Sequence, residues 1–147
     1  MTESPAPVLR GAYDGIDRET LAARLGVPRL ALFAEVTSTQ DVANALAGDG
    51  TPAGTLVLAD AQLAGRGRHG RRWASEAGAG IWLTLVERPT DAAALEVLSL
   101  RLGLEAARVL DGWADAPVRL KWPNDLLVGE AKLAGILVEV RWREQRA

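Results

Sequence analysis

The chain has 147 residues, 48% of them hydrophobic and 24% charged, with a net charge of −2. This length and composition suit one soluble globular domain, and the acidic balance counts against a nucleic-acid binder. Cysteine is absent, which excludes disulfides, thiol chemistry and a His/Cys zinc site, and His69 is the only histidine. The N-terminus lacks the features of a signal peptide, and no apolar run is long enough to span a bilayer. We therefore expect a soluble, cytoplasmic protein with no membrane partner.

The N-terminal part predicts an arm, a helix and a strand. Residues 1–16 are rich in Pro, Ala and Gly, and we expect a flexible arm there. Asp17 is typical of a helix N-cap, so a helix is predicted through Leu25 and ended by Gly26. Residues 30–36 are apolar and predict a strand.

A second helix and strand precede a glycine-rich stretch. Ser38 is expected to begin a helix that runs through Leu46, with Asp41 in the register of a capping box and Gly48 as its stop. Residues 55–60 are apolar and rich in β-formers, which predicts a strand.

The C-terminal part combines strands with one long helix. Apolar runs predict strands over 81–86 and 118–121, and apolar residues at helical spacing predict a helix over 91–112. Residues 126–128 and 132–140 predict a hairpin. Helices mixed with strands and a hairpin indicate an α+β fold rather than a series of βαβ units.

Between two of these strands lies a loop that reads Ala64-Gly-Arg-Gly-Arg-His-Gly-Arg-Arg-Trp73. Glycines allow the backbone to approach a ligand closely, and guanidinium groups match carboxylate and phosphate oxygens. A flexible basic linker, an RGG-like nucleic-acid segment and an anion-binding loop all fit this composition. RGG segments are normally repeated, whereas this loop occurs once between apolar strands, which favours the anion site.

A second polar motif reads Lys121-Trp-Pro-Asn-Asp125 and is followed by Lys132. Pro-Asn-Asp is a strong turn signal. Taken alone, this motif suits a surface turn with a half-buried Trp122, and Lys132 suits a solvated strand end.

Together the two motifs resemble the catalytic domains of biotin protein ligases, which carry a Gly-Arg-Gly-Arg-x-Gly-Arg loop and a later Lys-Trp-Pro-Asn-Asp turn. The resemblance extends to Val36-Thr-Ser-Thr-Gln40, Ala59-Asp-Ala-Gln62 and Lys132-Leu-Ala-Gly-Ile-Leu-Val-Glu139. It implies a mixed, largely antiparallel sheet with packing helices, similar to class II aminoacyl-tRNA synthetases. It also implies one partial catalytic domain over residues 17–147.

The resemblance assigns a set of residues to biotin. They are Ser38, Thr39, Gln40, Gln62, Arg66, Gly67, Arg68, Lys132 and Gly135. The first four would surround the ureido ring, and the glycine-arginine loop would fold over the ligand. Arg68 and Lys132 would be catalytic, because they would hold the carboxylate of biotin and the α-phosphate of ATP. His69 receives no role.

A further set is assigned to ATP: Arg71, Trp73, Lys121, Asn124 and Asp125, with Asp125 as a magnesium ligand. The implied activity is the ATP-dependent formation of biotinyl-5′-AMP. The biotinyl group would then pass to a lysine of a biotin carboxyl carrier protein.

The chain departs from the family at its C-terminal end, because relatives continue into further strands, helices and an SH3-like domain. Its N-terminus is short for the DNA-binding domain that some relatives carry, so we expect neither that domain nor a DNA partner. A fragment, a split product or a shortened relative would fit, and so would a homodimer or pairing with a missing C-terminal portion. A biotin-binding module without full catalysis and a lipoate ligase remain alternatives, and an RNA-binding role is the least favoured.

Overall fold

A computed structural model describes residues 6–91 and 93–142 of the chain. The chain divides into two compact units, Met1–Arg88 (unit 1) and Pro89–Ala147 (unit 2), and we describe each by itself. The single catalytic domain expected over residues 17–147 would span both units and stays a prediction. No helix in the described part of the chain is both long and apolar enough to cross a membrane.

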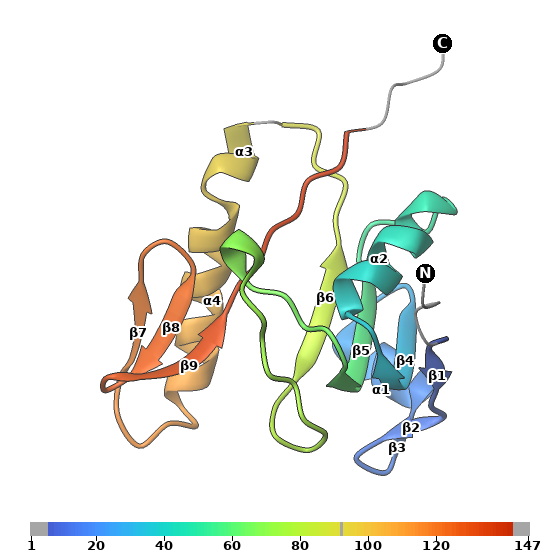
Figure 1. Cartoon of the computed structure of the whole chain (residues 1–147), viewed down its shortest axis with the longest axis horizontal. Helices are drawn as coiled ribbons and strands as arrows, with labels where there is room; N and C mark the ends of the chain where they lie inside the picture. The colour runs from blue at the N-terminus through green and yellow to red at the C-terminus, as the bar shows by residue number, and fades with distance from the viewer. Residues whose placement is uncertain (1–5, 92, 143–147) are drawn as a thin grey trace. The chain divides into compact units, whose positions relative to one another are not determined.

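Unit 1 is built on a four-stranded mixed sheet with the strand order β1-β4-β5-β6 (Figure 1). β4 and β5 are parallel, whereas β1 and β6 pair antiparallel to their neighbours, and β2 and β3 form a separate antiparallel pair. The elements of unit 1 are β1 (Val8–Leu9), β2 (Ala12–Tyr13), β3 (Ile16–Asp17), α1 (Arg18–Leu25), β4 (Leu30–Val36), α2 (Thr39–Gly48), β5 (Thr55–Gln62), the short 3₁₀ helix η1 (Arg68–Gly70) and β6 (Trp82–Val86).

Both faces of this sheet are apolar. Alternate side chains of a strand point to opposite faces, and successive residues of β4 and β5 are mostly apolar. Leu30 and Leu32 of β4 lie in a core cluster that packs against residues of α1. Phe33 of β4 and Val57 of β5 lie in the other cluster, which packs against α2. The helices therefore cover opposite faces, with α1 behind the sheet and α2 in front of it in Figure 1.

The helix N-caps of unit 1 are the residues that the sequence predicts. Asp17 caps α1 by accepting a hydrogen bond from the backbone N–H of Thr20, and Gly26 ends the helix in the left-handed conformation. Ser38 caps α2, which runs two residues beyond the predicted Leu46. These predictions of N-caps are confirmed.

The N-terminal arm differs from the prediction. We expected no regular structure before residue 17, but β1 extends the sheet along β4, and β2 and β3 form a hairpin. Arg10 forms an ion pair with Asp60 of β5. The physical reason is that β4 offers an unpaired backbone edge, which even a two-residue strand can occupy. Residues 1–5 of the predicted arm lie outside the described residues.

Unit 2 packs a helix against a three-stranded antiparallel sheet of order β7-β8-β9. Leu126 of β8 is fully buried in it, and Gly103 of α4 lies against Leu120 of β7. The elements of unit 2 are α3 (Ala93–Glu96), α4 (Leu98–Asp111), β7 (Val118–Lys121), β8 (Asp125–Val128) and β9 (Ala131–Gly135).

The long helix predicted over residues 91–112 is interrupted. Val97, with φ of −108° and ψ of 5°, separates α3 from α4. Apolar residues recur at helical spacing both before and after Val97, which predicted one helix. This spacing does not reveal that a single residue between them has a non-helical backbone conformation. The prediction of one continuous helix was therefore wrong.

The second strand of the hairpin is shorter than predicted. We expected it to span residues 132–140, but β9 ends at Gly135. β8 begins at Asp125, which pairs with Gly135, and the preceding residue Asn124 belongs to a turn. The N–H of Ile136 donates to the carbonyl of Asn124, and beyond this bond β8 offers no further residue with which the chain could pair. The α+β class with a mixed, largely antiparallel pairing of strands is confirmed.

Candidate functional site

The N-terminus of α2 forms the polar centre of unit 1. The parallel strands β4 and β5 end beside it, an arrangement in which ligands commonly bind at the carboxyl ends of strands. Ser38 and Thr39 are only 1% and 3% exposed, although both are polar. Buried polar groups need hydrogen-bond partners, and here several come from distant parts of the chain.

A chain of hydrogen bonds links four side chains at this centre. The hydroxyl of Thr84 on β6 lies 2.9 Å from that of Thr39. Gln62 at the end of β5 accepts bonds through Oε1 from the backbone N–H of Thr39, at 2.9 Å, and from its hydroxyl, at 3.1 Å. Gln62 Nε2 donates to Ser75 Oγ at 2.8 Å, and Ser75 donates to the carbonyl of Trp73 at 3.3 Å. The structure thus brings together Thr39 and Gln62, two of the predicted site residues.

The glycine-arginine loop, residues 64–73, leaves the sheet directly after Gln62 and returns as an irregular hairpin. The N–H of Trp73 donates to the carbonyl of Gly65 at 2.8 Å, and the N–H of Gly67 donates to the carbonyl of Arg71 at 2.7 Å. At the tip, His69 takes a positive φ of 57°. The loop thus has a defined stem and an exposed tip rather than the form of an extended linker.

Gly65 brings this stem close to the hydrogen-bond chain. A Cβ atom at Gly65 would lie 2.6 Å from the carbonyl oxygen of Trp73, 2.7 Å from Ser75 Oγ and 3.0 Å from Gln62 Nε2. These distances are too short for a carbon atom, so glycine is required here for close approach.

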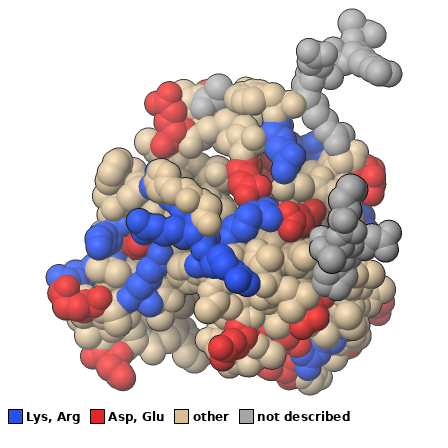
Figure 2. All heavy atoms as spheres, in the orientation of Figure 1, with Lys and Arg blue, Asp and Glu red and all other residues tan. Residues whose placement is uncertain are grey.

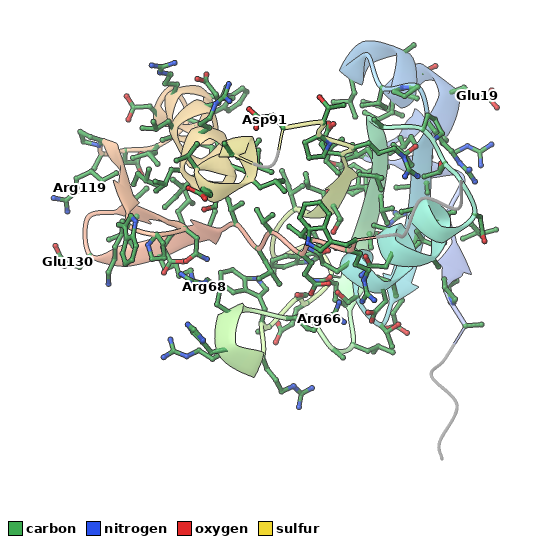
Figure 3. The ribbon with its side chains drawn as sticks, turned by 90° about the horizontal axis from the view of Figure 1, so that it is seen from above. Glu19, Arg66, Arg68, Asp91, Arg119 and Glu130 are labelled. Carbon is green, nitrogen blue, oxygen red and sulfur yellow. The ribbon has the colours of Figure 1, made fainter. Side chains whose placement is uncertain are left out.

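The arginines of the loop have different environments (Figure 3). Arg66 is part-exposed and binds Asp41 in the first turn of α2 at 2.5 Å. Arg68 and Arg71 are exposed. A loop with exposed guanidinium groups above a helix N-terminus suits a ligand with carboxylate or phosphate oxygens.

Unit 2 carries the predicted residues of β7, the β7–β8 turn, β8 and β9, which are Lys121, Asn124, Asp125, Lys132 and Gly135. Lys121 ends β7, is exposed and pairs in register with Asp125. Lys132 Nζ lies 2.7 Å from Asp125 Oδ1. Asn124 Nδ2 donates to the carbonyl of Ile136 at 3.0 Å, so the amide braces the start of the segment after β9. Asp125 and Lys132 are therefore brought together.

A surface turn with a half-buried Trp122 was expected from this motif taken alone, but Trp122 is 76% exposed. The peptide bond between Trp122 and Pro123 is cis. Gly135 pairs with Asp125 across the sheet, so its backbone lies beside the Asp125–Lys132 ion pair.

Basic and acidic side chains both reach the surface on the face of the molecule shown in Figure 2. Among the residues that the structure describes, no group of three or more His, Cys, Asp or Glu side chains could hold a metal ion. A divalent cation at Asp125 would therefore take its other ligands from water and a bound substrate.

Sequence reasoning missed Ser75, Thr84 and Asp41. Ser75 is 5% exposed, which the sequence of a glycine-rich loop does not reveal. Thr84 stands as a polar residue within the apolar run 81–86, and that interruption was the available signal. Asp41 was assigned only to a helix cap.

Known proteins resemble this chain in both sequence and structure. The profile of the Biotin/lipoate A/B protein ligase family matches residues 32–146. The bifunctional ligase/repressor BirA of Bacillus subtilis is 43% identical over 114 residues, which cover 76% of this chain and 34% of that protein. The biotin–[acetyl-CoA-carboxylase] ligase of Mycobacterium tuberculosis is 41% identical over 140 residues, covering 90% of this chain and 48% of that protein.

Solved structures of biotin protein ligases are also similar to this chain. The biotin protein ligase of Aquifex aeolicus, in complex with biotin and ATP, has a TM-score of 0.67 at 37% identity and matches 77% of this chain and 47% of that one. The enzyme of Leishmania major in complex with biotin has a TM-score of 0.66 at 33% identity, covering 78% and 52%. The chain spans about a third to a half of the length of these proteins. The family match over residues 32–146 nevertheless covers most of this chain, which therefore belongs to the biotin/lipoate A/B protein ligase family.

Proposed function

We propose that this chain provides the biotin-activating part of an ATP-dependent biotin protein ligase. In the first step, a carboxylate oxygen of biotin attacks the α-phosphorus of ATP, and the bond to pyrophosphate breaks. In the second step, a lysine amine of a biotin carboxyl carrier protein attacks the carbonyl carbon of biotinyl-5′-AMP, and AMP leaves. The relatives named for biotin ligation support this substrate over lipoate.

The observation that carries the proposal is the polar centre at the N-terminus of α2. Thr39 and Gln62, which lie in distant motifs of the sequence, are hydrogen-bonded to one another there. A ureido ring has a carbonyl acceptor and two N–H donors, so it needs both donors and acceptors from the protein. The hydroxyls of Ser38 and Thr39 and the amides of Gln40 and Gln62 offer both kinds of group.

The glycine-arginine loop would cover the bound biotin. Arg66 and Gly67 belong to its stem, and Arg68 begins its exposed tip. Biotin and ATP are both anions and repel each other, so the carboxylate and the α-phosphate must be neutralised before they can react. Arg68 and Lys132 would do this, and they would stabilise the charge that develops on the phosphoryl oxygens.

Arg68 lies in unit 1 and Lys132 in unit 2. Their convergence on one acyl-adenylate is part of the proposal. Within unit 2, the ion pair with Asp125 holds Lys132 beside the Lys-Trp-Pro-Asn-Asp turn.

The remaining residues would bind the nucleotide. Lys121, Asn124 and Asp125 would face its phosphates, while Arg71 and Trp73 would lie near the rest of ATP. Mg²⁺ would supply further neutralisation of the phosphate charge, and Asp125 is the residue that would contribute to holding it.

Closure of the loop would also protect the product. Biotinyl-5′-AMP is a mixed anhydride that water hydrolyses, so a covered site preserves it until the carrier lysine arrives. No protein nucleophile is required for either step, in keeping with a chain that contains no cysteine.

The decisive experiment measures pyrophosphate release from ATP with and without biotin, together with mass spectrometry of a carrier protein after incubation with the chain, ATP and Mg²⁺. We expect biotin-dependent release and a biotinylated lysine. Arg68→Gly should lower the rate about 10²- to 10³-fold, the usual cost of removing one group that stabilises a transition-state charge.

Two results would contradict the proposal in different ways. Biotin binding without ATP-dependent turnover would indicate a binding module. Unchanged kinetics of Arg68→Gly would contradict the role of that arginine, and Arg24→Gly, on the exposed surface of α1, provides the control for loss of charge.

A further inference from the structure

The hydrogen bonds of Gln62 and Ser75 each have a defined donor and acceptor. A backbone N–H only donates, so the bond from Thr39 N fixes the oxygen end of the Gln62 amide toward α2. The nitrogen end must then point to Ser75 Oγ, which accepts at 2.8 Å. The hydrogen of the Ser75 hydroxyl is directed to the carbonyl of Trp73.

Ser75 is held on two sides. Its backbone carbonyl accepts from the N–H of Gln62 at 3.0 Å, so main chain and side chain of Gln62 both contact it. It is 5% exposed, and its hydroxyl oxygen lies 2.7 Å from the position that a Cβ atom of residue 65 would take. Ser75 thus lies between the end of β5 and the stem of the glycine-arginine loop.

We propose that Ser75 is a positioning residue, which holds the Gln62 amide in one orientation and ties it to the loop stem at Trp73. The inference rests on the proposed function, because Gln62 contacts biotin only under that function. Loss of the hydroxyl would leave the nitrogen of Gln62 without its acceptor. The side chain would gain rotamer freedom that a ligand must then remove on binding.

Amide hydrogen exchange of Thr39, followed by NMR in the full chain without ligand, reports this positioning directly. The N–H of Thr39 is bonded to a side chain that Ser75 orients. Isothermal titration with biotin provides the second measurement. The variants are Ser75→Ala, which removes the hydroxyl, and Ser75→Cys, which fills the space but forms only weak hydrogen bonds.

Thr20→Ala is the control. The Thr20 hydroxyl also donates one hydrogen bond, to Asp17 at 2.7 Å, but it lies in α1, which covers the face of the sheet opposite to α2. Thr39 exchange and the affinity for biotin should both stay at the wild-type values in this variant.

We expect Ser75→Ala and Ser75→Cys to raise the exchange rate of Thr39 and to weaken biotin binding, each by about tenfold, the usual effect of one lost hydrogen bond. Wild-type behaviour of Ser75→Ala would overturn the proposal. So would a wild-type Ser75→Cys beside an impaired Ser75→Ala, since packing alone would then explain the effect. A wild-type chain that does not bind biotin would overturn the proposed function, while Thr39 exchange would still decide whether Ser75 orients Gln62.

Discussion

Gly65 and Gly67 stand two residues apart in the same loop, but their surroundings differ. A side chain at Gly65 would meet the backbone carbonyl of Trp73, which belongs to the paired stem and has little freedom to move. At Gly67 the nearest atoms to a Cβ lie 3.5 Å and 3.7 Å away, in ordinary van der Waals contact. One glycine is therefore required by packing and the other is not.

We predict that Gly65→Ala destabilises the chain by about 1 to 3 kcal/mol, the usual cost of forcing an extra methyl group into a packed site. Gly67→Ala is the control, and its free energy of unfolding should stay near that of the wild type. Urea denaturation measures both. Equal midpoints for the two variants would show that the stem adjusts to a side chain at residue 65.

Helix α1 depends on a charged cap at its exposed N-terminus. The backbone N–H of Thr20 donates to Asp17 at 2.8 Å and the Thr20 hydroxyl donates at 2.7 Å. Both bonds favour the ionised carboxylate, and the backbone bond is the larger cause that holds the pKa of Asp17 below its ordinary value of 3.8.

The sign of the pH dependence follows from this lowered pKa. The cap contributes its full stability above the pKa of the unfolded chain, and the contribution is lost as the pH falls through the lower pKa of the folded state. We predict that any stability advantage of the wild type over Asp17→Asn disappears as the pH drops below 3.8. NMR titration of Asp17 and urea midpoints at each pH test this. An Asp17 pKa at or above 3.8 would refute it.

At the scale of the whole molecule, the residues proposed to bind biotin and ATP come from both units of the chain. Residues proposed to contact the ureido ring belong to unit 1, whereas Lys132 and the Lys-Trp-Pro-Asn-Asp turn belong to unit 2. A ligand that contacts both units would link their stabilities, because anything that binds only the folded state raises its stability.

We predict that biotin at a hundred times its Kd stabilises the chain by about 2.7 kcal/mol and raises the temperature of thermal unfolding. Lipoic acid at the same concentration is the control, since it has a carboxylate but no ureido ring to engage Thr39 and Gln62. Differential scanning calorimetry gives the comparison. An equal shift with the two acids would mean that the polar centre does not select biotin.

Much of the local structure was predictable because it depends on neighbours in sequence. The caps at Asp17 and Ser38 and the strands over residues 30–36 and 55–60 follow from side chains within a few positions of one another. The motifs around residues 66–68 and 121–125 also indicated the family without any structure. The break at Val97 escaped prediction because apolar residues at helical spacing on both sides of it fit one helix. The early end of β9 escaped prediction because it depends on where the paired strand β8 begins.

The amino-acid sequence by itself determined the α+β class and the family. Only the tertiary structure decided that Ser75 and Thr84 join Thr39 and Gln62 in one hydrogen-bond chain, and that Asp41 holds Arg66. The physical reason is that such bonds connect residues up to 45 positions apart. Their geometry arises from the parallel pairing of β4 with β5 and the return of β6, which no local pattern records.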